Sequence, residues 1–337
     1  MKTLLKAVAT LCAVCLFLSF RVEASQMTDT SRSHSFRITA YLTLDNPIPE
    51  SVYDRMDKID YLNIAFINPK TSGKFVVADS IHSIIQKARE HNKKIKVLVS
   101  IGGQGHHGYI RELITPDHSQ AFINCIVDMV MQGFDGVDLD FEKDIVDANY
   151  GDFIQKLALA LHTCSKGRKE LTAAVGTDFF NPKFSFPAAV WNSMDFINMM
   201  SYDLYSENKP QQQAPIFQVD SDTYYWHKEA GVDSMRLGLG LPFYGYRFYK
   251  GGFGRNLKSK EIPFSEILGS NYHGTAALDI DTIATDNVIF YNGTTTIRQK
   301  THFAFQHLGG IMIWQLAEDA PGQYSLLDII CSELNRP

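Results

Sequence analysis

Several features that define common classes of protein are scarce or missing in this sequence. Only five of its 337 residues are cysteine, and two of those lie in an apolar N-terminal run. The other three, Cys125, Cys164 and Cys331, have no short-range spacing, which favours small buried side chains and leaves one disulfide open as an alternative. The formal net charge is −5 and no run of Lys and Arg offsets it, which argues against a nucleic-acid partner. No G-x-S-x-G motif occurs, so the lipase type of serine hydrolase has no support.

Long apolar runs are also missing, apart from Ala7–Phe20, which is too short to span a bilayer comfortably. Two lysines precede this run and the small-residue sequence Val22-Glu23-Ala24 follows it, as in a secretory signal peptide. We therefore predict a signal peptide over residues 1–24 and a mature chain of residues 25–337. The mature chain is expected to be secreted, extracellular or periplasmic, and to need no membrane.

The most informative stretch covers residues 134–142. In it, apolar side chains alternate with acidic ones: Val137, Leu139 and Phe141 with Asp138, Asp140 and Glu142. This period of two predicts a β-strand with one apolar face and one face that carries three carboxyl groups. Like charges on one wall repel each other, so at least one carboxyl group should hold a proton at neutral pH. Such a strand suits acid–base chemistry better than plain architecture.

Two other interpretations of the acidic strand compete with the catalytic one. A solvated edge strand would look similar, but the flanking chain reads as helix on both sides, which predicts a covered, parallel strand. Acidic triplets also bind Ca²⁺ or Mg²⁺, but the spacing is not that of a calcium loop and no second acidic cluster lies nearby in the sequence. We predict that the protein uses no metal and no cofactor.

Strands and helices alternate along the whole mature chain. Apolar runs predict eight strands, at residues 36–41, 61–67, 95–101, 134–142, 171–175, 196–200, 236–241 and 310–314. Amphipathic helices are expected between them, one of which starts at Thr115-Pro116, and an irregular segment is expected from Tyr246 to Tyr291. This pattern predicts an α/β fold, a (β/α)8 TIM barrel in a single domain with a short insertion after the seventh strand. A doubly wound open sheet is the competing architecture.

Aromatic and polar side chains gather where the predicted strands end. In a (β/α)8 barrel these carboxyl ends meet at one mouth, where the catalytic groups lie. Aromatic faces stack on the apolar faces of sugars while carboxylates bind the hydroxyl groups, so the mouth predicts a sugar site. Besides the acidic strand, the candidate residues at strand ends are Tyr41, Phe66, Gly103, Met200, Tyr202, Asp203, Tyr244 and Trp314.

The glycine-rich run Gly103–Gly108 matches the spacing of a dinucleotide-binding loop. That site also needs a helix that opens at once and an acidic residue about 20 positions further on. Here the predicted helix starts late, at Thr115, and the next strand ends too far away. His106 and His107 within the run have no metal-ligand spacing, so they are interpreted as loop residues.

Taken together, these motifs resemble glycoside hydrolase family 18, the chitinase-like enzymes, over nearly all of the mature chain. Residues 135–142 are similar to the family's D-G-x-D-x-D-x-E strand and residues 100–103 to its S-x-G-G strand. Residues 200–203 resemble its M-x-Y-D segment, residues 239–245 its seventh strand, and Trp314 the tryptophan that floors its sugar pocket. In two respects the sequence departs from many members: Phe141 stands where they have Trp, and the segment after the seventh strand is short.

The resemblance implies hydrolysis of β-linked N-acetylglucosamine with retention, in which the acetamido oxygen of the substrate is the nucleophile. It implies that Glu142 protonates the leaving oxygen and then activates water, and that Asp140 orients the acetamido group. It further implies that Asp138 shares a proton with Asp140, that Tyr202 binds the acetamido carbonyl, and that Asp203 holds the sugar ring.

We expect an endo-acting, monomeric chitinase whose partner is chitin or another oligosaccharide that contains N-acetylglucosamine. Two alternatives stay open. One is an endo-β-N-acetylglucosaminidase that cuts the chitobiose core of N-glycans. The other is a non-catalytic chitinase-like lectin, which the presence of Glu142, Asp140 and Tyr202 disfavours.

Overall fold

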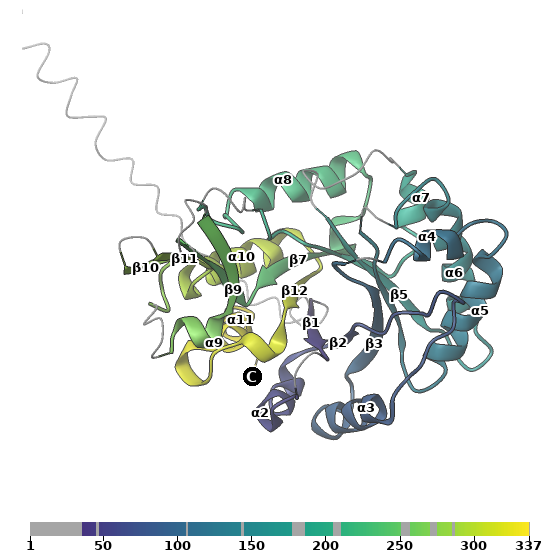
Figure 1. The fold of residues 1–337 in the computed structure, drawn as a ribbon, viewed down its shortest axis with the longest axis horizontal. Helices are drawn as coiled ribbons and strands as arrows, with labels where there is room; N and C mark the ends of the chain where they lie inside the picture. The colour runs from purple at the N-terminus through teal and green to yellow at the C-terminus, as the bar shows by residue number, and fades with distance from the viewer. Residues whose placement is uncertain are drawn as a thin grey trace, which may run out of the picture. The chain divides into compact units, whose positions relative to one another are not determined.

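A computed structural model describes residues 36–44, 47–105, 107–142, 145–176, 186–204, 210–250, 257–269, 275–284 and 287–336. The predicted signal peptide, residues 1–24, and His106 lie outside the described residues. Figure 1 shows the fold, coloured along the chain from purple to yellow. Among the described residues, no helix is both long enough and apolar enough to cross a membrane.

Eight parallel strands close into a barrel, and β1 closes it by pairing with both β2 and β12. The strands are β1 (Arg37–Thr43), β2 (Tyr61–Ala65), β3 (Lys96–Gly102), β4 (Gly136–Asp140), β5 (Glu170–Val175), β6 (Phe196–Met199), β7 (Leu237–Pro242) and β12 (Gly310–Trp314). Their order around the barrel follows the chain, as repeated β–α units require. The predicted (β/α)8 barrel is confirmed. The alternative of an open doubly wound sheet is wrong because the register of Ala40 with Ile313 joins the first strand to the last.

Helices surround this barrel (Figure 1). The longer ones are α3 (Asp79–His91), α5 (Ser119–Val130), α6 (Tyr150–His162), α8 (Gln218–Tyr224), α10 (Thr294–His307) and α11 (Leu326–Glu333). Shorter helices are α2 (Glu50–Tyr53), α4 (Ile110–Leu113) and α7 (Ala188–Trp191). In α6 the buried side chains Phe153, Ile154, Leu157 and Leu161 recur every three or four residues, so one apolar stripe packs onto the barrel.

The helix before β4 begins later than the sequence suggests. Thr115-Pro116 looks like a helix start, but α5 begins at Ser119 and the one-turn helix α4 precedes it. The Thr115 hydroxyl donates to the carbonyl of Glu112 at 2.7 Å, so it satisfies the end of the preceding helix instead of capping the next one.

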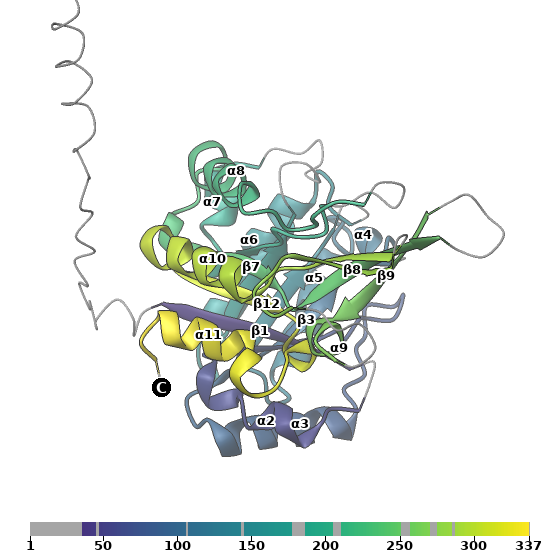
Figure 2. The ribbon, with the colours of Figure 1, turned by 90° about the vertical axis from the view of Figure 1, so that its left-hand side faces the viewer.

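The segment after β7 is a small antiparallel sheet, so the expectation of an irregular segment is wrong. Its elements are β8 (Tyr244–Lys250), β9 (Leu257–Pro263), α9 (Phe264–Ile267), β10 (Ile280–Ala284) and β11 (Asn287–Phe290), with strand order β10-β11-β8-β9. Tyr244, Tyr246 and Phe248 alternate along β8 and are buried, which is the period of two that forms a strand. Figure 2 shows β8 and β9 reaching out from the mouth of the barrel.

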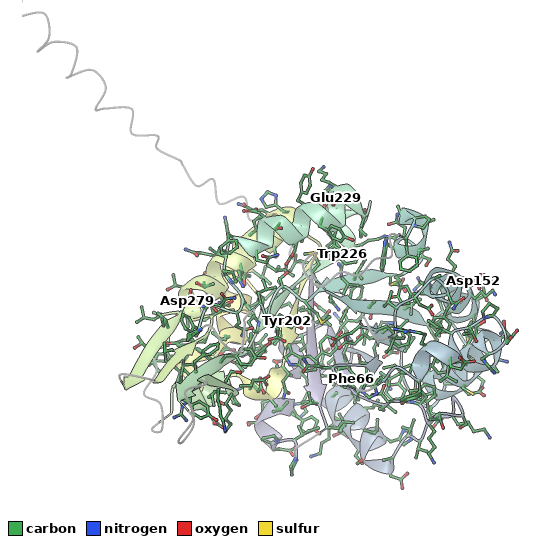
Figure 3. All side chains as sticks on the ribbon, turned by 45° about the horizontal axis from the view of Figure 1, so that its top comes forward. Phe66, Asp152, Tyr202, Trp226, Glu229 and Asp279 are labelled. Atoms are coloured by element: carbon green, nitrogen blue, oxygen red, sulfur yellow. The ribbon has the colours of Figure 1, made fainter. Side chains whose placement is uncertain are left out.

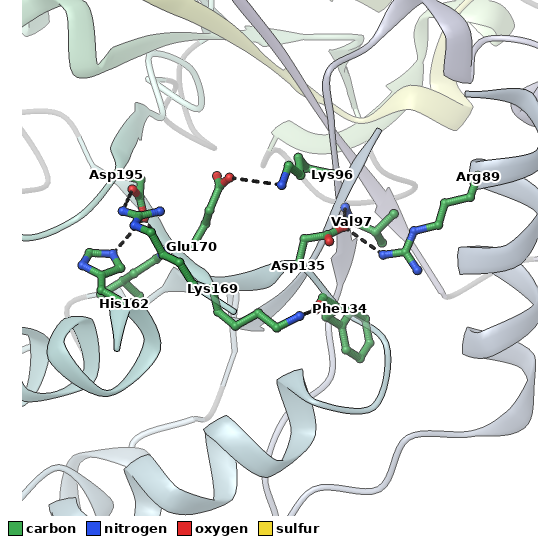
Figure 4. Close-up of polar contacts among 11 residues, drawn as sticks. Arg89, Lys96, Val97, Phe134, Asp135, His162, Lys169, Glu170 and Asp195 are labelled. Carbon is green, nitrogen blue, oxygen red and sulfur yellow. Dashed lines mark hydrogen bonds and ion pairs between the residues drawn. The ribbon is translucent and has the colours of Figure 1, made fainter. Parts of the chain in front are cut away.

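Three aspartates brace the opposite, amino-terminal end of the barrel. These residues, Asp60, Asp135 and Asp195, immediately precede β2, β4 and β6, respectively. The side chain of each accepts a backbone N–H from the neighbouring strand β1, β3 or β5: that of Ile38 at 2.8 Å, Val97 at 2.9 Å and Leu171 at 2.9 Å, respectively. Each also pairs with an arginine: Arg336, Arg89 and Arg168, respectively. Figure 4 shows Asp135 between Arg89 and Val97, and Asp195 beside His162. Every one of these carboxylates therefore has a cation and a backbone donor.

The three described cysteines, Cys125, Cys164 and Cys331, form no disulfide. Cys125 and Cys164, which were expected to be buried, are partly exposed, whereas Cys331 is buried.

Candidate active site

Strand β4 carries the acidic stretch through the barrel. Val137 and Leu139 are fully buried in the apolar core that the helices share. Side chains alternate along a strand, so Asp138 and Asp140 take the opposite face and point into the barrel. Asp138 lies in register with Ser100 of β3 and Thr172 of β5. The two neighbouring strands thus present hydroxyl groups at the level of the first carboxyl group.

Asp138 is surrounded by hydroxyl donors. One of its oxygens accepts the hydroxyls of Tyr41 at 2.6 Å and Ser100 at 2.8 Å, and the other accepts that of Thr172 at 2.6 Å. Burial raises the pKa of Asp138, while these hydrogen bonds lower it and partly offset that effect. Burial and the nearby charge of Asp138 raise the pKa of Tyr41 well above its usual range, so the phenol remains a donor. The carboxyl group is therefore held firmly at the base of the acidic strand.

Asp140 lies one step nearer the mouth in a different environment. Its side chain is 4% exposed, and its Oδ1 atom accepts no hydrogen bond from the part of the protein that the structure describes. Burial raises the pKa of Asp140 well above its usual range, and the negative charges of Glu142 and Asp138 raise it further. The carboxyl group is consequently stabilised in its protonated form and has an acceptor atom to spare for a ligand.

Glu142 comes directly after β4, where the chain turns at the mouth. Its backbone carbonyl accepts the amides of Ile145 at 2.8 Å and Val146 at 3.2 Å. Its side chain is partly exposed, whereas Asp138 and Asp140 are buried. The carboxyl group of Glu142 therefore has access to solvent and to a bound molecule, and its charge is felt at Asp140.

An aromatic group lies beside these carboxyl groups at the ends of β1, β2 and β12. The rings of Phe66 and Trp314 are stacked with centroids 5.7 Å apart and an angle of 28°, and the ring of Tyr41 lies 5.3 Å from that of Trp314. Gly103 makes this packing possible, because a Cβ atom there would lie 2.4 Å from the Phe66 ring and its φ is +84°. Trp314 and Phe66 are partly exposed, whereas Tyr41 is buried. Tyr41 thus supports Asp138 from below, and the exposed faces belong to Trp314 and Phe66.

On the other side, the end of β6 supplies Met200, Tyr202 and Asp203. Tyr202 is 5% exposed and lies near the middle of the barrel in Figure 3, as does Phe66. Burial raises the pKa of Tyr202 well above its usual range, and Asp140 raises it further, so its hydroxyl stays protonated and can donate. Met200 is partly buried in the cluster that contains Tyr202, Tyr244 and Trp314.

Asp203 is held by two tyrosines from the insertion. The same carboxyl oxygen, Oδ1, accepts the hydroxyl of Tyr244 at 2.5 Å and that of Tyr246 at 3.0 Å. Burial raises the pKa of Asp203, and these two hydrogen bonds lower it. The insertion after β7 therefore reaches back to the residue that ends the M-x-Y-D segment.

The structure adds residues that the sequence did not single out. Thr172 donates to Asp138 and Tyr246 donates to Asp203. Thr172 could have been found, because it lies at an inward position of a predicted strand between apolar neighbours. Tyr246 was missed because its segment was expected to be irregular, although Tyr244, Tyr246 and Phe248 alternate in the sequence with the period of a strand.

In the glycine-rich loop after β3, the structure describes the surroundings of His107. The Nε2 atom of His107 lies 3.5 Å from the Nδ2 atom of Asn68, and the His107 ring packs against the ring of Tyr109. Across all the ranges described above, no group of three or more His, Cys, Asp and Glu side chains is placed to hold a metal ion.

The sequence matches the family profile of glycosyl hydrolases family 18 over residues 30–319. The chain belongs to this family. The match covers every strand of the barrel and the insertion, and it therefore includes all of the candidate residues at the mouth.

Solved family 18 structures share the fold along most of the chain. ChiB, a chitinase from the chitin utilization locus of Flavobacterium johnsoniae, is 32% identical with a TM-score of 0.75, covering 89% of this chain and 94% of its own. Among curated relatives, mouse chitotriosidase-1 is 25% identical over 312 residues, which cover 76% of this chain and 67% of its own.

A chitinase-like agglutinin from Robinia pseudoacacia also shares the fold. Its TM-score is 0.74 at 24% identity, covering 88% of this chain and 99% of its own. Proteins with this fold therefore include one named as a chitinase and one named as an agglutinin.

Proposed function

We propose that this protein is a secreted chitinase that hydrolyses β-1,4-linked N-acetylglucosamine with retention of anomeric configuration. The observation that carries the proposal is the contrast between two neighbouring carboxyl groups. Three hydroxyls donate to Asp138, while one oxygen of buried Asp140 accepts no hydrogen bond from the residues that the structure describes. The acetamido N–H of N-acetylglucosamine is a donor that this oxygen can accept. Membership of family 18 and the chitinase relatives support the substrate class.

Glu142 is the proposed general acid and base. It stands just beyond the end of β4 with access to a bound sugar, and its charge raises the pKa of Asp140, so the two carboxyl groups act on one another at the mouth. It donates its proton to the glycosidic oxygen as the bond to the anomeric carbon breaks. In the second step it accepts a proton from the water that attacks the anomeric carbon.

The acetamido oxygen of the substrate is the proposed nucleophile. Asp140 is the last residue of β4 and Glu142 follows it by two positions, so their Cα atoms lie no more than about 7 Å apart, on the same wall of the mouth. An enzymic nucleophile would have to approach from the face of the sugar opposite the acid, which neighbours on one wall cannot do. Asp140 instead orients the acetamido group, and the Tyr202 hydroxyl binds its carbonyl.

Proton NMR during the first minutes of chitooligosaccharide hydrolysis tests this mechanism. Retention predicts that the β-anomer appears first, and a thiazoline mimic of the cyclic intermediate should inhibit. Substrates in which a hydroxyl replaces the acetamido group should be essentially inert. An initial α-anomer would mean inversion by activated water and would overturn the mechanism.

We further propose internal cleavage of long chains, because the insertion after β7 is confined to a segment that ends with β11 at Phe290. Early products from a soluble chitin derivative should then be mixed oligomers, whereas disaccharide alone would indicate cleavage from chain ends.

Assaying a high-mannose glycopeptide beside chitooligosaccharides separates the chitinase from an endo-β-N-acetylglucosaminidase. Binding without hydrolysis of either substrate would instead indicate a lectin like the Robinia agglutinin.

A further inference from the structure

Three consecutive glutamines, Gln211, Gln212 and Gln213, lie between the barrel mouth and the insertion. Their side chains alternate in direction, as in an extended strand. Gln211 donates to the carbonyl of Leu204 at 2.7 Å, whereas Gln212 turns the other way and donates to the carbonyls of Asp279 and Tyr291 at 3.2 and 2.6 Å. The run therefore faces the end of the M-x-Y-D segment on one side and the insertion on the other.

Gln213 uses both ends of its side-chain amide at the candidate site. It is 0% exposed. Its Oε1 atom accepts the backbone N–H of Asp203 at 2.9 Å, and its Nε2 atom donates to the carbonyl of Tyr244 at 3.3 Å. Its own backbone carbonyl accepts the N–H of Leu204 at 2.8 Å. One residue thus fixes Asp203 and also the strand that carries the tyrosine bonded to Asp203.

Asp203 needs such support because its backbone is in an unfavourable conformation. Its φ is +62°, a left-handed value that costs an L-residue about 1–2 kcal/mol relative to the right-handed one. The surrounding structure must therefore hold it there. The hydrogen bonds that Gln213 accepts from the N–H groups of Asp203 and Leu204 provide that restraint. In this conformation the carboxylate of Asp203 accepts the hydroxyls of Tyr244 and Tyr246.

We propose that Gln213 is a positioning residue that holds Asp203 in the left-handed conformation required to bind the sugar. This inference rests on the proposed function for the sugar, but the hydrogen bonds that carry it do not. Gln213 itself touches no substrate and acts through Asp203.

Ala214, which follows Gln213 in the chain, anchors the loop that carries Gln213. The carbonyl of Ala214 accepts the ammonium group of Lys300 at 2.8 Å and the amide of Asn292 at 3.0 Å, and Lys300 also donates to Asn292 at 2.7 Å. Lys300 is fully buried, and burial lowers its pKa to about 7. The loop, the end of the insertion and helix α10 therefore meet at one point, so Gln213 is held from behind while it holds Asp203.

Two matched variants test the proposal. Gln213→Met keeps the length of the side chain and removes both hydrogen bonds to the site. Gln212→Met removes the hydrogen bonds that Gln212 donates to Asp279 and Tyr291 and the one that it accepts from the N–H of Ala214 at 3.3 Å, and none of these three reaches Asp203 or Tyr244. Hydrogen exchange of the peptide that contains Asp203 and Leu204 should become about tenfold faster in Gln213→Met and remain near the wild-type rate in Gln212→Met.

Kinetics on chitooligosaccharides provide the second readout. We expect Gln213→Met to lower kcat/KM roughly 10- to 100-fold, mainly by raising KM, and Gln212→Met to change it less than about threefold.

Gln213→Glu provides a rescue that depends on pH. Near pH 5 a buried carboxyl group remains protonated, so it can accept from Asp203 and donate to Tyr244 and should restore most of the activity. As the pH rises and the carboxyl group ionises, it loses the donor and repels Asp203, so activity relative to wild type should fall to that of Gln213→Met.

Equal exchange and equal kinetics in the two methionine variants would overturn the role of Gln213. Wild-type protein without hydrolysis or binding of chitooligosaccharides would overturn the proposed function instead. In that case the exchange rates at Asp203 still decide whether Gln213 holds this residue.

Discussion

The two ends of the barrel both carry aspartates, but these have opposite kinds of hydrogen-bonding partners at the two ends. At the amino-terminal end, Asp60, Asp135 and Asp195 each pair with an arginine and accept a backbone amide. At the carboxyl-terminal mouth, hydroxyl groups donate to Asp138 and Asp203, and no ion pair reaches either carboxyl group within the described ranges.

This difference separates stability from chemistry. A carboxylate with a cation and an amide is stabilised in its charged form and braces neighbouring strands. A buried carboxyl group without a cation is stabilised in its neutral form, which destabilises the protein at neutral pH but prepares a proton for transfer. The buried carboxyl groups at the mouth therefore lower the stability of the fold, and the paired carboxylates at the opposite end raise it.

Among these variants, Glu142→Gln should cause the largest loss of hydrolysis. A small loss would mean that the mouth is not specialised for chemistry as the comparison between the two ends requires. The amide cannot donate or accept the transferred proton, so we expect hydrolysis to fall about 10²- to 10⁴-fold. Folding and oligosaccharide binding should remain near normal because the shape of the side chain is kept. Hydrolysis rates, thermal melting and binding of a chitooligosaccharide measure these three quantities. A loss below tenfold would contradict the assignment of Glu142 as the general acid.

Asp135→Asn is the matched change at the opposite end. It removes the charge that pairs with Arg89 at 2.9 Å and weakens the acceptor for Val97, so the free energy of unfolding should fall by about 1.5–3 kcal/mol. Hydrolysis per folded molecule should stay near that of wild type. Denaturant unfolding and rate measurements at equal folded concentration check both expectations. Unchanged stability would mean that the braced end does not stabilise the barrel.

Asp140→Asn should abolish most hydrolysis yet stabilise the fold at neutral pH. Because burial and neighbouring charges raise the pKa of Asp140 above 3.8, the folded state binds a proton that the unfolded state has released. Stability is therefore lost as the pH rises from about 4 towards the folded pKa. The amide avoids this loss, so we expect a gain of about 1 kcal/mol at pH 7 and less near pH 4. Lower stability of Asp140→Asn than of wild type at pH 7 would contradict the contrast between the two ends.

Glu318→Gln should produce the smallest effect, on the pH dependence alone. Glu318 follows Trp314 at the mouth, and burial, followed by the charge of Glu261, raises its pKa from 4.5 to about 8. The folded state therefore holds the proton more strongly, so wild-type stability should decline as the pH rises from about 4.5 to 8. The variant should show a shallower decline, by less than about 1 kcal/mol because the side chain is only partly buried. Melting curves across this range measure how stability changes with pH. The same change in both proteins would mean that Glu318 is not one of the carboxyl groups whose burial costs stability at neutral pH.

Local patterns predicted the barrel well because strands and helices impose their own periods on the sequence. The alternation in residues 134–142 predicted an acidic face, and Asp138 and Asp140 of that face lie inside the barrel, whereas Glu142 lies beyond the end of β4 and is partly exposed. Failures occurred where the signal was short or ambiguous. Thr115-Pro116 resembled a helix start, but a neighbouring helix end used its hydroxyl. The first strand of the insertion was missed although Tyr244, Tyr246 and Phe248 alternate along it, because a glycine and an arginine occupy the positions between them and make the segment look irregular.

The sequence by itself determined the fold class, the family and the order of acidic groups on one strand. These follow from periods of two and 3.6 residues, which act between neighbours in the chain. Only the tertiary structure decided which partner each carboxyl group has: hydroxyls from three strands for Asp138, tyrosines of the insertion for Asp203, and Gln213 behind it. Those partners come from distant segments, and closure of the barrel brings them together. Burial and hydrogen bonding in that closed space then shift the pKa of each carboxyl group, which no local pattern encodes.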